Sequence, residues 1–224
     1  QAMARIVEMI RDVKPETVNF ASLELETATA IRQLALVAQI QKHIDRDTPI
    51  RFLIAECESP ATVLIAVFFA KLFGVEKIVD ISPLFETPTA LETGARFVER
   101  LLEEEAYRDY VKDRGRLCIH TGFSDAGRFL GQIPATLSIE RLYNGLADLM
   151  ERAELPGVEL LIFSTHGESM GRGAHPGDLK SRLAYVFPPA ARRRFAEYGI
   201  EIKHETSFQG GDGFMFFANR GLTQ

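Results

Sequence analysis

The sequence predicts an α/β fold, specifically a partial TIM-type (β/α) barrel with parallel strands and outer helices. Four apolar runs, at 51–56, 77–81, 116–120 and 158–163, have the nearly continuous hydrophobic pattern of strands buried on both faces. A segment with helical spacing follows each run, and such alternation is typical of a parallel sheet covered by helices. Eight strands would close a barrel. Weaker patterns at both ends bring the count to six or seven, which is compatible with an incomplete barrel or an open sheet.

The first third of the chain supplies three helices and two strands. Residues 3–13 place Ile6, Met9 and Ile10 on one helical face. A short strand is expected at 18–20, a long helix at 26–44 and a strand at 51–56. Ser59 and Pro60 then supply an N-cap and a proline at the first helical position for a helix that ends near residue 74.

The remaining elements repeat this strand-then-helix order. Strand 77–81 leads to a helix at 87–105, and residues 107–112 extend or follow this helix. Strand 116–120 leads to a long helix from about 127 to about 152, which we expect to be interrupted at Pro134. Strand 158–163 opens into a glycine-rich segment, 165–177, and two short helices are expected within 178–198. The runs 200–208 and 214–217 have strand patterns.

Composition predicts one domain over residues 1–224 and disfavours several classes of function. The chain has 224 residues, 46% hydrophobic, which is enough for one sizeable core. Its net charge of −5 disfavours nucleic-acid binding, because phosphate contacts need a basic face. No apolar run reaches membrane length and no signal-peptide pattern is present. We expect a cytoplasmic protein that binds neither nucleic acid nor membrane, with Cys57 and Cys118 as buried free thiols.

Chemically capable side chains follow three consecutive strands. Glu86 follows strand 77–81, Asp125 follows strand 116–120, and His166 and Arg172 follow strand 158–163. The carboxyl ends of parallel strands share one edge, so these residues are expected to converge. Two carboxylates without a nearby His or Cys cluster suit Mg²⁺ or Mn²⁺. Arg128 and Arg172 could bind carboxylate or phosphate oxygens, so the edge suits an anionic substrate whose enolate is stabilised by the metal.

Each of these residues also has a purely structural interpretation. Glu86 and Asp125 are placed where acidic side chains stabilise helix N-termini. Arg128 lies inside a helix and could pair with a surface acid. His166 could hydrogen-bond its own backbone within the glycine-rich segment. Arg172 lies between two glycines, which fits oxyanion binding better than a structural role.

The ordered motifs of the chain resemble those of phosphoenolpyruvate carboxylase. Pro83-Leu84-Phe85-Glu86-Thr87 is followed by Gly122-Phe123-Ser124-Asp125, then by His166-Gly167 and Gly171-Arg172-Gly173, and then by Gln209-Gly210. Ser59-Pro60-Ala61-Thr62-Val63-Leu64 is similar to the segment that precedes the first motif in that family. The resemblance covers about residues 45–217.

The resemblance implies an α/β barrel that carboxylates phosphoenolpyruvate with bicarbonate, giving oxaloacetate and phosphate, a lyase reaction of carbon dioxide fixation that feeds the tricarboxylic acid cycle. It implies Mg²⁺ or Mn²⁺ as cofactor. A half barrel leaves two sheet edges and much apolar surface uncovered, so we also expect a homo-oligomer. The resemblance places the metal ligands at Glu86 and Asp125, catalytic groups at His166, Arg172 and Arg128, and substrate contacts at Arg172, Gly171, Gly173 and Ser124. Arg128 takes the place of a family lysine, which keeps the charge and changes its geometry.

Two departures bear on function. The glycine motif is two residues shorter than in the family and has Glu168 near the place of its first arginine. The family's proteins are several times longer, so we expect this chain to be a piece of a longer barrel enzyme, inactive alone, that carries the metal-binding half of the site. The alternatives are a metal-dependent 2-oxo acid lyase or aldolase, and a non-catalytic barrel scaffold.

Overall fold

The structure is a computed structural model that describes residues 2–17, 19, 29–165, 178–206 and 221. The helices within these ranges are α1 (Ala2–Asp12), α3 (Thr29–His43), α4 (Pro60–Leu72), α5 (Pro88–Glu103), α6 (Glu105–Arg114), α7 (Phe123–Leu130), α8 (Gln132–Ala153), α10 (Leu179–Val186) and α11 (Pro189–Glu197). The strands are β1 (Ile50–Ile54), β2 (Val79–Phe85), β3 (Arg116–Thr121), β4 (Glu159–Ser164) and β5 (Ile202–Thr206). No helix among these residues is long and apolar enough to span a membrane.

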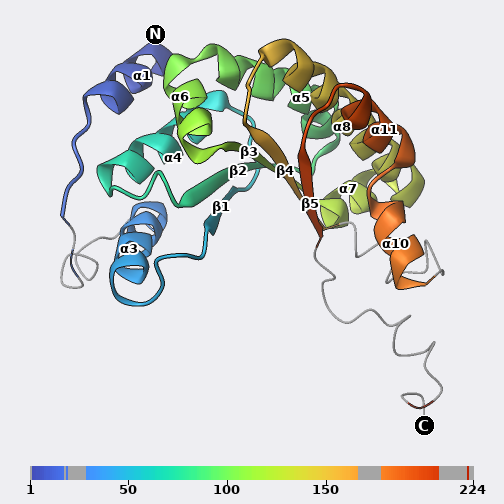
Figure 1. The fold of residues 1–224 in the computed structure, drawn as a ribbon, viewed down its shortest axis with the longest axis horizontal. Helices are drawn as coiled ribbons and strands as arrows, with labels where there is room; N and C mark the ends of the chain where they lie inside the picture. Colours follow the sequence, from blue (N-terminus) through green and yellow to red (C-terminus); the bar gives the residue numbers. More distant parts are fainter. Residues whose placement is uncertain (1, 18, 20–28, 166–177, 207–220, 222–224) are drawn as a thin grey trace.

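The five strands form one sheet in the order β1-β2-β3-β4-β5, and every neighbouring pair is parallel. Helices α1, α4, α5, α6, α8 and α11 arch over one side of this sheet (Figure 1). A strand order that never reverses, with helices on one side, is the winding of a (β/α) barrel and differs from a doubly wound sheet. The predicted α/β fold with parallel strands and outer helices is confirmed over five strands. The predicted strand at 214–217 lies outside the described residues. Residues 18 and 20 of the predicted short strand at 18–20 also lie outside them.

The hydrophobic core fills the space between the sheet and these helices. Alternate residues of the central strands, such as Ile81, Ile119 and Ile162, are at most 1% exposed and belong to one cluster with Leu101 of α5 and Leu146 of α8. Because side chains alternate across a strand, the intervening residues face the other, concave side of the sheet. Cys57 and Cys118 are both buried free thiols, as predicted.

Two boundaries differ from the sequence prediction. The helix break falls at Gly131, whose φ of 85° ends α7, and not at Pro134. Pro134 lies in the first turn of α8, where a missing N–H costs nothing because that group has no partner inside the helix. Strand β2 was expected to end at residue 81, but it continues through Pro83 to Phe85. Pro83 has no backbone N–H to donate, and the residues of β2 that pair with β3, Leu84 and Phe85, lie after it.

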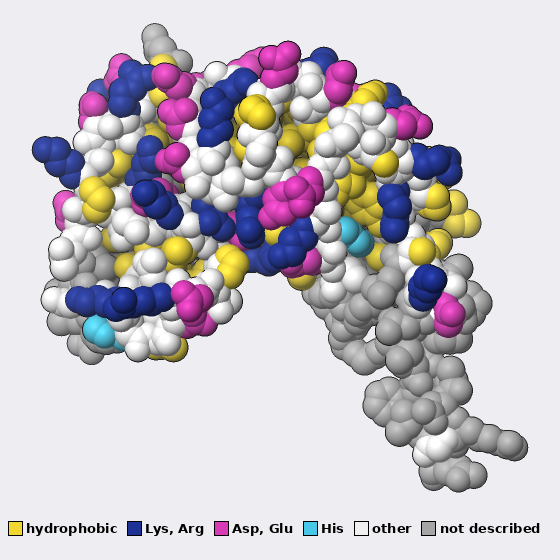
Figure 2. Space-filling model, viewed as in Figure 1, with side chains coloured by type: hydrophobic (Ala, Val, Ile, Leu, Met, Phe, Trp, Pro, Cys, Tyr) yellow, Lys and Arg dark blue, Asp and Glu magenta, His cyan; other side chains and the backbone are white. Residues whose placement is uncertain are grey.

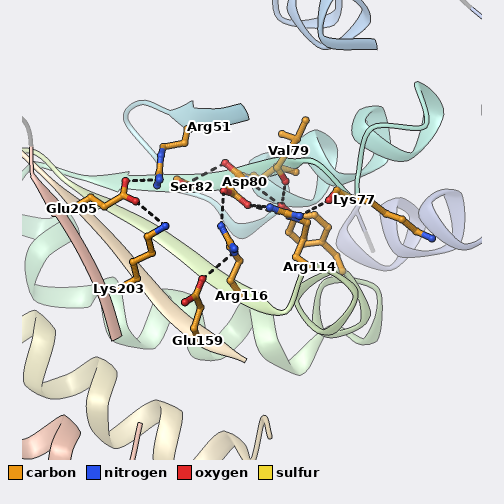
Figure 3. A network of polar contacts seen from close by, with 12 residues as sticks. Arg51, Lys77, Val79, Asp80, Ser82, Arg114, Arg116, Glu159, Lys203 and Glu205 are labelled. Carbon is orange, nitrogen blue, oxygen red and sulfur yellow. Dashed lines mark hydrogen bonds and ion pairs between the residues drawn. The ribbon is translucent and has the colours of Figure 1, made fainter. Parts of the chain in front are cut away.

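A row of charged residues crosses the concave side of the sheet (Figure 3). Arg51 of β1 is in register with Asp80 of β2, and Arg116 of β3 is in register with Glu159 of β4. Arg116 contacts Asp80 at 3.6 Å and Glu159 at 3.2 Å. Asp80 is fully buried and also accepts from Arg114, whose Nε lies 3.0 Å from Oδ1. The alternating charges therefore neutralise one another between neighbouring strands.

The sheet is curled strongly enough for its two edge strands to meet through side chains. Arg51 of β1 forms an ion pair with Glu205 of β5, and its guanidinium lies 5.6 Å from the ring centre of Phe163 on β4. Glu205 also pairs with Lys203 at 3.2 Å. In the space-filling view, charged side chains gather beside the hollow that the helices leave uncovered (Figure 2). The concave side thus resembles the interior of a barrel.

Candidate functional site

The candidate site is the edge of the sheet where the parallel strands end. Glu56 lies two residues after β1, Glu86 directly follows β2, Asp125 lies in the helix after β3, and Thr165 directly follows β4. Glu86 and Asp125 lie close enough for the charge of Asp125 to raise the pKa of Glu86. We call Glu86 and Asp125 the carboxylate pair.

The position of Glu86 depends on a glycine in the neighbouring strand connection. The β2–β3 register places Glu86 opposite Gly122, whose N–H donates to Phe85 O at 3.0 Å. A Cβ at residue 122 would lie 2.8 Å from Glu86 Cβ and 2.9 Å from its Oε2. Only glycine fits against Glu86 in this arrangement.

Glu86 is not needed as the cap of the following helix. Thr87 is the N-cap of α5, and its Oγ1 accepts from the backbone N–H of Ala90 at 3.2 Å. Pro88 occupies the first helical position and requires no partner for a backbone N–H. The half-buried Glu86 carboxyl is therefore available for another role at the strand ends.

Asp125 lies in the first turn of α7, because the helix begins at Phe123 and not at about residue 127 as the sequence indicated. Its Oδ1 pairs with Arg128 at 3.0 Å, and Arg128 also donates to Ser124 Oγ at 3.1 Å. Arg128 is 73% exposed and reaches both partners from the same helix. Arg128 therefore pairs with an acid, as its structural interpretation predicted. That acid is Asp125, a member of the carboxylate pair.

Carboxylate charge accumulates at this edge. Burial raises the pKa of Glu86, and the charges of Asp125 and Glu56 raise it further, while a hydrogen bond from the Glu56 backbone lowers it. Glu56 is exposed and has a φ of 48°, an uncommon backbone conformation for a residue other than glycine. The sequence did not single out Glu56 as a site residue. Glu56 is nevertheless the last residue of the predicted strand 51–56, a position comparable to that of Glu86 after the next predicted strand.

The remaining predicted site residues, His166, Gly171, Arg172 and Gly173, lie outside the described residues. Over the part of the chain that is described, no group of three or more His, Cys, Asp or Glu side chains has the geometry to hold a metal ion. Any metal at this edge would therefore take two protein carboxylates at most from the described residues, with its other ligands from substrate or water, a pattern common for Mg²⁺.

Comparison with known proteins identifies the family. The family model for phosphoenolpyruvate carboxylase matches residues 1–182. The chain belongs to this family. It is 32% identical over 125 residues to the phosphoenolpyruvate carboxylase of Tolumonas auensis, 30% over 128 residues to phosphoenolpyruvate carboxylase 1 of Zea mays, and 30% over 155 residues to the enzyme of Aeromonas salmonicida.

The chain spans only a small part of these relatives. The three matches cover 56%, 57% and 68% of this chain but 14%, 13% and 17% of the respective relatives. The carboxylate pair lies within the matched residues 1–182, as does the glycine-rich segment. Family membership thus supports the resemblance on which the site prediction was based.

Proposed function

We propose that this chain is part of a phosphoenolpyruvate carboxylase, in which it supplies the metal-binding half of the site within a single barrel domain. The observation that carries this proposal is the convergence of Glu86 and Asp125 at the carboxyl ends of β2 and β3, in a chain of this family. The reaction converts phosphoenolpyruvate and bicarbonate into oxaloacetate and phosphate.

The carboxylate pair fits Mg²⁺ or Mn²⁺. Both ions prefer oxygen ligands, and two carboxylates with water and substrate suffice for an octahedral site. Burial raises the pKa of Glu86 and the charge of Asp125 raises it further, and a divalent cation would relieve the repulsion between the two carboxylates. One Asp125 oxygen contacts Arg128, which leaves the other for a metal. When bound, the metal would supply Lewis-acid stabilisation of the enolate oxygen.

The protein's own groups would bind and orient the reactants. In the proposed sequence, a bicarbonate oxygen attacks the phosphorus atom, which gives carboxyphosphate and the enolate of pyruvate. Carboxyphosphate then loses phosphate, and the enolate carbon attacks the released carbon dioxide. Arg172 would neutralise the migrating phosphate, Gly171 and Gly173 would let the backbone approach it, and His166 would assist at the glycine motif. Arg128 and Ser124 would contact the substrate from α7.

The test is carboxylation by the complete native protein that contains this chain. Oxaloacetate formation from phosphoenolpyruvate and bicarbonate, followed by its reduction with NADH, should require Mg²⁺ or Mn²⁺. Glu86→Gln and Asp125→Asn should each lower kcat/KM by on the order of 10²-fold or more, whereas Glu92→Gln, at an exposed position of α5, should not. We expect no turnover by the 224-residue chain alone, because the glycine motif and the pair supply only part of the site.

A metal-dependent 2-oxo acid lyase is the second candidate, and Glu168 favours it because an acid near the glycine motif would repel a phosphate. Such an enzyme would cleave oxaloacetate or a related 2-oxo acid without forming or consuming phosphate. A non-catalytic scaffold would neither carboxylate nor cleave. Measuring phosphate release together with oxaloacetate distinguishes all three. We also expect the complete protein to be a cytoplasmic homo-oligomer.

A further inference from the structure

Helix α7, which carries Asp125, lacks the usual cap at its own N-terminus. Its N-cap residue is Gly122, and glycine has no side chain to accept from the first N–H groups of the helix. Serine, threonine, asparagine and aspartate would cap it, but each has a Cβ, which would lie within 2.9 Å of two Glu86 atoms. The space taken by Glu86 therefore excludes a cap from the helix's own sequence.

The cap comes from the neighbouring strand instead. Thr165, the residue after β4, accepts the backbone N–H of Phe123 at 2.8 Å through its Oγ1, and this contact is buried. Thr165 is itself fixed, because its N–H donates to Thr121 O at 3.0 Å, which continues the β3–β4 ladder by one residue. Thr165 is 7% exposed, so water does not readily replace its hydroxyl.

The length of α7 makes this contact important. The helix has eight residues, and Asp125 lies in its first turn, two residues after the capped N–H. Short helices gain little from propensity alone, so their geometry depends on caps and packing. Phe123 is fully buried, and its backbone is held between the β3 connection and Thr165. The direction in which α7 leaves the sheet, and with it the position of the Asp125 carboxylate, thus depends on a residue of another strand.

We propose that Thr165 is a positioning residue for the carboxylate pair: by capping α7 from the end of β4, it sets where Asp125 lies relative to Glu86. This inference rests on the proposed function, in which the pair binds a divalent metal. Thr165 itself contributes no ligand, and its hydroxyl acts through the α7 backbone.

The test compares two substitutions in the complete native protein. Thr165→Val keeps the branched shape and removes the acceptor, whereas Thr165→Ser keeps the hydroxyl. A side-chain cap is worth about 0.5–2 kcal/mol, so in Thr165→Val the amides of Phe123 and its neighbours in the first turn should exchange about 2- to 30-fold faster with deuterium. The Mn²⁺ dissociation constant should rise within the same range, and Thr165→Ser should restore both. If Thr165→Val does not fold, Thr165→Ala replaces it as the variant that lacks the hydroxyl.

A matched control separates positioning from a general loss of stability. Tyr110→Phe removes a buried hydroxyl that bonds Val79 O at 2.6 Å, at the opposite end of the sheet. It should lower the free energy of unfolding and leave Mn²⁺ affinity unchanged. Unchanged exchange of the first turn in Thr165→Val would overturn the proposal, as would faster exchange with unaltered Mn²⁺ affinity. Failure of the proposed function has a different signature, namely Mn²⁺ affinity that is insensitive to Glu86→Ala and Asp125→Ala.

Discussion

Gly122→Ala is the substitution that tests the geometry of the carboxylate pair most sharply. The backbone at residue 122 has φ −91° and ψ 122°, which any residue adopts, so alanine introduces no backbone strain. Its whole effect comes from the added methyl group, which would lie 2.8 Å from Glu86 Cβ. Carbon atoms in contact are about 3.5–4.0 Å apart, so Glu86 must move by roughly 0.7 Å or more, together with its backbone.

The expected cost follows from this displacement. Forcing a methyl group into a packed site costs about 1–3 kcal/mol, and for a chain of this size that corresponds to a melting temperature lower by about 2–12 °C. Because Glu86 moves, Mn²⁺ affinity of the complete protein should also fall, by about tenfold or more. Urea unfolding followed by circular dichroism, and a Mn²⁺ titration followed by electron paramagnetic resonance, would measure the two effects.

Gly127→Ala is the matched control. Gly127 lies inside α7, and an added Cβ would meet Phe123 at 3.4 Å or more, an ordinary contact. Alanine in place of an interior helical glycine stabilises by about 0.5–1 kcal/mol, so the two glycine substitutions, five residues apart, should have opposite signs. If Gly122→Ala leaves both stability and Mn²⁺ affinity unchanged, Glu86 does not lie where the structure has it and the reasoning fails.

Three further outcomes are expected. Asp80→Asn should cost about 3–5 kcal/mol in urea unfolding, because it removes the fully buried carboxylate that pairs with Arg114, whereas Glu205→Gln in the more exposed pair should cost about 0–1 kcal/mol; equal losses would contradict the burial argument. The folded-state pKa of Glu86 is raised, so its ionised form opposes folding as pH rises through that pKa, and Glu86→Gln should raise the free energy of unfolding at pH 7 but not at pH 3. Burial lowers the pKa of both His120 and His204 to about 4, so stability should fall as pH drops from about 6.5 towards 4; a flat profile in a wild-type titration would argue against their burial.

The sequence predicted the fold from features that act locally. Apolar runs, helical spacing and the Ser59-Pro60 cap placed most elements within a few residues, and Ser59 Oγ does accept from Ala61 N at 3.3 Å. The errors have physical causes: Pro134 was expected to break a helix that Gly131 breaks, because a proline in the first turn costs nothing.

Contacts between distant segments could not be predicted in the same way. Glu86 and Asp125 were expected to converge because parallel strand ends share an edge. Their dependence on Gly122 and Thr165 follows from packing between β2, β3 and β4, which no local pattern encodes. The ion pair between Arg51 and Glu205 depends on the curvature of the whole sheet. The sequence therefore shows both charged residues but does not predict that they pair.

The most direct test of the account is Mn²⁺ binding to the complete native protein, compared with its Glu86→Ala and Asp125→Ala variants. If the two carboxylates share one metal at the ends of β2 and β3, the wild type binds one ion specifically, and each substitution alone abolishes that binding. Specific Mn²⁺ binding that survives both substitutions would place the metal elsewhere and contradict the account, and so would the absence of specific binding in the wild type.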